Sequence, residues 1–82
     1  MKWKSNYKHP DGLGFVIEYE RLWDSIGLKY DDVYYLIGFD KEDRDICNYF
    51  QEGLDVCQEQ AFDQFGVPED SWVETDEPSR YV

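Results

Sequence analysis

The chain has 82 residues, 19 acidic against 8 basic side chains and a formal net charge of −11, which is the size of one small domain. Apolar residues make up 41% and aromatic residues 18% of it, which excludes a disordered acidic tail, because such tails are poor in aromatic side chains. The longest apolar runs, Phe15 to Ile17 and Val33 to Ile37, are far shorter than the ~20 residues of a membrane span. We therefore expect a single acidic globular domain over 1–82 that has no membrane partner.

The N-terminal segment predicts two strands joined by a hairpin. Over 2–8, Trp3, Ser5 and Tyr7 alternate with lysines and an asparagine, which is the period of a half-exposed strand. Residues 9–14 are dense in turn formers and predict a connection to a second strand over 14–21.

Residues 15–26 fit two patterns. The alternation from Phe15 to Tyr19 suits a strand, whereas apolar residues spaced by three or four up to Ile26, with Gly27 beyond, suit a helix. Because β-branched and aromatic residues dominate the first half, we favour a strand there, followed by a helical turn over Leu22–Ile26.

A third strand and a long helix are predicted next. Over 32–39 the apolar side chains alternate onto one strand face. Asp40 is a suitable N-cap for a helix over 41–65, which Gly66 would end, while Gly53 would cost roughly 1 kcal/mol inside it. Its apolar stripe falls within an ~80° arc and comprises Ile46, Phe50, Leu54, Cys57 and Ala61.

These elements predict an α+β fold, in which a three-stranded antiparallel sheet of 2–8, 14–21 and 32–39 packs against one long helix at 41–65. The alternative is a small all-α bundle, because 15–26 can also be drawn as an amphipathic helix.

The two cysteines predict free thiols. On one continuous helix the Cα atoms of Cys47 and Cys57 would lie ~15 Å apart, beyond the ~7 Å limit of a disulfide. No apolar segment long enough for a secretory signal follows the first four residues. Because free thiols fit a reducing compartment, we expect a cytoplasmic protein.

The sequence carries no catalytic or metal-binding motif that we can identify. His9, the single histidine, lies in a predicted turn without a positioned partner for acid–base work, and one histidine with two separated cysteines does not make a zinc site. We expect no enzyme, no cofactor and no metal. Direct nucleic-acid binding is also disfavoured, since a net charge of −11 would face the phosphates.

A row of acidic side chains would lie opposite the apolar stripe of the predicted helix. Five carboxylates fall within an ~80° arc, with Tyr49 at its edge and no lysine or arginine among them. Like charges at these spacings destabilise a helix by a few tenths of a kcal/mol each, which a basic partner would explain; an ordinary solvated face is the alternative. The five are Asp45, Glu52, Asp55, Glu59 and Asp63.

This acidic row, continued by Glu69 and Asp70 within 40–77, resembles the small DNA-mimic inhibitors made by phages, which include anti-CRISPR and anti-restriction proteins. Immunity proteins that cap nuclease toxins have a similar profile. The resemblance implies a non-enzymatic inhibitor that occupies the basic nucleic-acid-binding channel of a defence or DNA-processing protein, in the cytoplasm of a host cell if a phage encodes it.

Aromatic anchors beside the row would supply affinity, and the candidates are Tyr34, Tyr49, Trp72 and Tyr81. The alternative function is a general protein-interaction module, or a small subunit, that binds through exposed aromatic residues. The predicted partner-binding set is Asp45, Tyr49, Glu52, Asp55, Glu59, Asp63, Glu69, Asp70 and Trp72.

Overall fold

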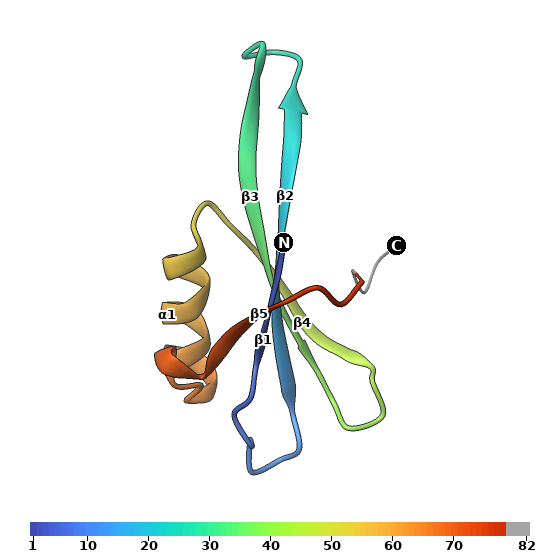
Figure 1. Cartoon of the computed structure of the whole chain (residues 1–82), viewed down its shortest axis with the longest axis vertical. Coiled ribbons are helices and arrows are strands. Elements are labelled where there is room, and N and C mark those ends of the chain that lie inside the picture. The colour runs from blue at the N-terminus through green and yellow to red at the C-terminus, as the bar shows by residue number, and fades with distance from the viewer. Residues whose placement is uncertain (79–82) are drawn as a thin grey trace.

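Five antiparallel strands form the framework of the protein (Figure 1). The structure is a computed structural model, which describes residues 1–78. The strands are ordered β4-β3-β2-β1-β5 in one sheet, and one α-helix packs on it. The elements are β1 (Lys2–Ser5), β2 (Gly14–Asp24), β3 (Lys29–Phe39), β4 (Asp45–Gln51), α1 (Leu54–Phe65), the 3-10 turn η1 (Glu69–Ser71) and β5 (Trp72–Thr75).

The α+β class, with one helix on an antiparallel sheet, is confirmed, and the all-α alternative is wrong. The sheet has five strands rather than three. The predicted helical turn over Leu22–Ile26 is also wrong, because β2 continues to Asp24. The carboxylate of Asp24 then accepts hydrogen bonds from the backbone N–H groups of Ile26 and Gly27, which closes a tight turn into β3.

The predicted helix over 41–65 is wrong in its first half, where Asp45–Gln51 form β4. Asp40 is not a helix N-cap. Its carboxylate instead accepts the backbone N–H groups of Glu42 and Arg44 in the turn between β3 and β4, and these bonds, that from Arg44 above all, lower the pKa of Asp40. The helix begins only after Gly53, which is extended, and it ends as predicted at Gly66 in the left-handed conformation.

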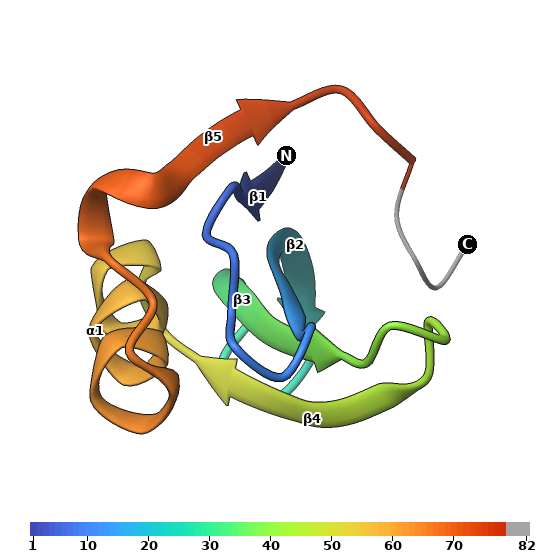
Figure 2. The same cartoon turned by 90° about the horizontal axis from the view of Figure 1, so that it is seen from below.

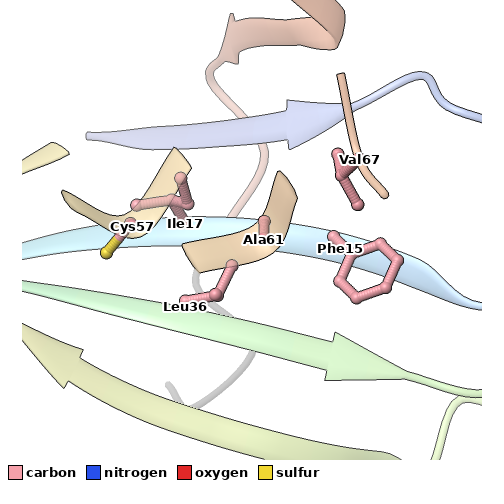
Figure 3. Close-up of a cluster of buried hydrophobic side chains, with 6 residues drawn as sticks. All are labelled: Phe15, Ile17, Leu36, Cys57, Ala61 and Val67. Carbon is pink, nitrogen blue, oxygen red and sulfur yellow. The ribbon is translucent and has the colours of Figure 1, made fainter. Parts of the chain in front are cut away.

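One side of the sheet holds the main core. Figure 2 shows the sheet curving around α1. Side chains from β2 and β3 meet the inward face of α1 and the segment after it, as Figure 3 shows. The fully buried members of this core are Phe15, Ile17, Leu36, Cys57, Ala61 and Val67. Because Cys57 and Ala61 face the sheet, the opposite side of α1 faces solvent.

Two strands extend well beyond the rest of the sheet. β1 pairs with β2 only as far as Glu18, and β4 pairs with β3 only from Tyr34. Residues 20–33, here named the arm, therefore form a two-stranded hairpin that projects from the body of the molecule (Figure 1). The arm accounts for the elongated dimensions of 44 × 25 × 21 Å.

Within residues 1–78, no helix has both the length and the apolar character required to cross a bilayer.

Leu36 tests the core directly. Leu36→Ala should lower the free energy of unfolding by about 3 kcal/mol, since it leaves a cavity against α1, in a domain of the kind held by roughly 5–15 kcal/mol. Urea unfolding followed by circular dichroism measures this. The exposed Val73→Ala on β5 is the control, and it should change the free energy by no more than about 0.5 kcal/mol. Equal effects of the two substitutions would contradict this description of the core.

Candidate acidic interaction face

The outward side of α1 carries three carboxylates at four-residue intervals. Asp55, Glu59 and Asp63 are all exposed, and successive members lie ~6 Å apart along the helix axis because each residue rises 1.5 Å. They point outward because Cys57 and Ala61, on the other side of the helix, are fully buried in the core. We name these three residues the acidic face.

Two apolar side chains border the acidic face. On a helical wheel Val56 and Phe62 flank the three carboxylates, and the five side chains span an arc of ~120°. Both Val56 and Phe62 are exposed. The outward side of α1 therefore presents three carboxylates and two exposed apolar side chains together.

Within residues 1–78, no basic side chain forms an ion pair with the acidic face. The segment from Asp45 to Glu77 contains ten acidic residues and no lysine, arginine or histidine. Among the residues that the structure describes, the carboxylates of Asp55, Glu59 and Asp63 take part in no ion pair. The ion pairs that do occur lie elsewhere: Lys4 with Glu77, Lys29 with Asp31, and Arg44 with Asp40 and Glu42.

Two of the five carboxylates that the predicted helix would have aligned lie outside α1. Asp45 lies at the start of β4, and Glu52 lies in the bend between β4 and α1. Since a strand rises ~3.3 Å per residue, Asp45 lies ~20 Å from Gln51 at the C-terminal end of β4. Glu52 remains close to the N-terminal end of α1. Glu69 and Asp70 are exposed on η1, which follows α1 in the chain.

The predicted aromatic anchors lie on the core instead of on the acidic face. Tyr34, Tyr49 and Trp72 are partly buried and pack against the core cluster. The indole Nε1 of Trp72 is buried and has no hydrogen-bond partner within residues 1–78. Tyr81 lies outside the described residues.

Sequence reasoning missed Val56 and Phe62 because the predicted helix ran through Gly53. The apolar stripe of that predicted helix was defined partly by Ile46 and Phe50, which belong to β4 in the structure. A helix that starts after Gly53 has Leu54, Cys57 and Ala61 on its inward side, and it leaves Val56 and Phe62 as apolar residues on the outward side.

The side chains most able to do chemistry are engaged in structure. His9 accepts the backbone N–H of Asp11 through Nδ1, and its ring contacts the rings of Tyr7 and Phe15. Within residues 1–78 no three side chains of the metal-binding types lie close enough together to hold an ion. The two cysteines are free thiols on different elements, Cys47 on β4 and Cys57 on α1.

A groove of about 750 Å³ opens elsewhere on the molecule, with carboxylates along it. Glu18 and Lys2 are both buried there as cross-strand neighbours, and the Lys2 ammonium donates to the carbonyl of Pro78 at 3.0 Å. Burial, and then the nearby Glu20, raise the pKa of Tyr35 on its wall. The acidic character of the protein is thus not confined to α1.

Comparisons with protein-family models, with curated proteins and with solved structures found no match to this chain. Its function has to be argued from the residues themselves.

The cysteines provide a test of how the face of α1 is oriented. Burial, with a smaller effect of Asp55, raises the pKa of Cys57 to about 12, and burial also raises the pKa of Cys47. Both thiols therefore stay protonated at neutral pH, and since the thiolate is the reactive form, Cys57 should not react with Ellman's reagent at pH 8 until the protein unfolds. Mapping the modified residue by mass spectrometry checks this. Rapid labelling of Cys57 in the folded protein would mean that α1 is turned differently.

Proposed function

We propose that this protein is a non-enzymatic acidic inhibitor that occupies the basic nucleic-acid-binding channel of a defence or DNA-processing protein. The observation that carries the proposal is the acidic face, in which Asp55, Glu59 and Asp63 are exposed in register on a rigid helix. No base lies between Asp45 and Glu77 to neutralise them.

The spacing of these carboxylates suits a channel built for phosphates. One strand of duplex DNA presents a charge every ~3.4 Å along the axis, so carboxylates ~6 Å apart match about every second phosphate of that strand. Glu52 before the helix and Glu69 with Asp70 after it lengthen the charged track at both ends of α1.

Charge alone would give a weak and salt-sensitive complex, because an exposed ion pair contributes about 0–1 kcal/mol. Val56 and Phe62 supply apolar contact on the same side of the helix. Long-range attraction between a −11 protein and a basic channel raises the association rate, and the two apolar side chains slow dissociation once the surfaces meet.

The alternative function, an interaction module that binds through exposed aromatic residues, is favoured by a different observation. Trp23 and Tyr30 are exposed on the arm, which projects away from the part of the sheet that α1 covers (Figure 1). The two functions differ in their response to salt, because electrostatic attraction is screened at high ionic strength whereas apolar contact is not.

The proposal is tested with two DNA-processing enzymes, a guide-loaded CRISPR nuclease and a restriction endonuclease. DNA cleavage by each is titrated with the wild-type protein and with the double variant Glu59→Lys, Asp63→Lys. Wild type should inhibit at least one enzyme, less strongly as salt rises, and the double variant should lose about tenfold or more in potency. Asp55 is left unchanged, because an acid in the first turn stabilises the helix.

The matched control is Asp11→Lys with Asp76→Lys, which changes the net charge by the same amount at exposed positions outside α1. It should retain potency to within about threefold. Equal losses in the two variants would show that only total charge matters, and inhibition that survives the reversal on α1 would rule out the acidic face. Circular dichroism verifies that both variants are folded.

A further inference from the structure

The arm lacks the support that a two-stranded hairpin needs. Among residues 1–78, no third strand pairs with it beyond Glu18 on β2 or before Tyr34 on β3, and α1 packs on the body (Figure 1). An isolated two-stranded hairpin is marginally stable in water unless further strands or a helix cover a hydrophobic face. Contact with a further protein surface would therefore stabilise residues 20–33.

The tip of the arm also carries highly exposed apolar side chains. The exposed fractions are 94% for Ile26, 74% for Leu28, 54% for Trp23 and 56% for Tyr30. The turn that presents Ile26 is fixed by the carboxylate of Asp24. Contiguous apolar patches of this kind on a soluble domain mark sites of association.

The charged groups of the arm already have partners within the same chain, and the partner of Glu20 is Tyr35. Asp24 accepts two backbone N–H groups, and Lys29 pairs with Asp31 at 3.8 Å. The Arg21 guanidinium lies 4.3 Å from the centre of the Tyr30 ring, and Asp32 accepts the hydroxyl of Tyr19. Such a surface needs no strongly charged partner, and it can be covered without leaving an unpaired charge.

One face of the arm is ordered so that it complements itself. Arg21 and Asp32 are cross-strand neighbours, and the next pair on that face toward the tip is Trp23 with Tyr30, whose rings are 5.0 Å apart. Suppose that two arms pack with this face together and antiparallel, about a two-fold axis that runs between the Arg21–Asp32 pair and the Trp23–Tyr30 pair. The Arg21 of one copy then lies on the Trp23 ring of the other. The same packing sets Asp32 beside the hydroxyl of Tyr30. Arginine on an indole face is the stronger form of cation–π contact.

We propose that the arm is the dimer interface of this protein, and that its occupant is the arm of a second copy packed antiparallel. This arrangement places the two acidic bodies at opposite ends of the assembly. Because the Debye length is ~8 Å at physiological salt, bodies separated by the length of the arms repel each other little. The acidic face on α1 stays free, so the dimer does not depend on the proposed inhibitor function.

The interface is small, so the dimer is weak. A few residues from each arm fall short of the ~800 Å² per partner that a standard interface buries, and association in the micromolar range is the expected strength. The self-repulsion of two −11 chains opposes it further at low salt. Raising the salt concentration therefore strengthens this dimer, whereas it weakens binding of the acidic face to a basic channel.

Sedimentation velocity across a concentration series, at low and at high salt, tests the proposal. The wild-type mass should rise from 9.8 kDa toward twice that value with concentration, and more readily at high salt. Trp23→Ser and Ile26→Ser should each weaken association by about tenfold or more. Ile26→Ser is the cleaner variant, because a side chain that is 94% exposed contributes little to the folded arm.

Val73→Thr is the matched control, since Val73 is 54% exposed on β5, in the body, and it should associate like the wild type. A mass that stays at 9.8 kDa at every concentration and salt would overturn the proposal. So would a dimer that persists in both arm variants, or one that salt dissociates. None of these results bears on inhibition by the acidic face, which the α1 charge reversals test separately.

Discussion

The packing of one short helix into one side of a curved sheet is the constraint on which the rest of this protein depends. The inward positions Cys57 and Ala61 of α1 meet Ile17 and Leu36 of the central strands, and a hydrogen bond from the Gln51 amide to Gln60 at 2.7 Å joins the end of β4 to the helix. In so small a domain no second helix shares this role. Once two residues of α1 are fixed inward, its outward surface is fixed as well.

The same constraint explains why the arm exists. The central strands are 11 residues long, whereas β1 and β5 have four residues and β4 has seven. A 12-residue helix spans only ~18 Å, so it covers the part of β2 and β3 that has neighbours on both sides. The arm, which is the rest of β2 and β3, also carries aromatic residues, but no helix covers it. Trp23 and Tyr30 are exposed for this reason.

The sequence predicts those parts of the fold that neighbouring residues determine. It fails where pairing with a strand distant in the sequence determines the structure. The start of β2 at Gly14, the end of β3 at Phe39 and the helix stop at Gly66 follow from turn residues and alternation. The segment 45–51 carries apolar residues at both helical and strand spacings, and pairing with β3 selects the strand. The acidic face over 55–63 could be predicted from the sequence, but its apolar borders Val56 and Phe62 could not. The start of α1 after Gly53 determines which apolar side chains face outward, and the sequence did not indicate that start.

Two surfaces with opposite physical character result from this division of the molecule. In the proposed inhibitor the acidic face on α1 acts over distance, because uncompensated charge would attract a basic partner through solvent and lose strength with salt. In the proposed dimer the arm acts only on contact, through exposed apolar side chains that include Trp23, Ile26 and Leu28. We expect a change of salt concentration to move the strengths of these two proposed interactions in opposite directions. Ionic strength thus separates the contribution of each surface in a single preparation of the protein.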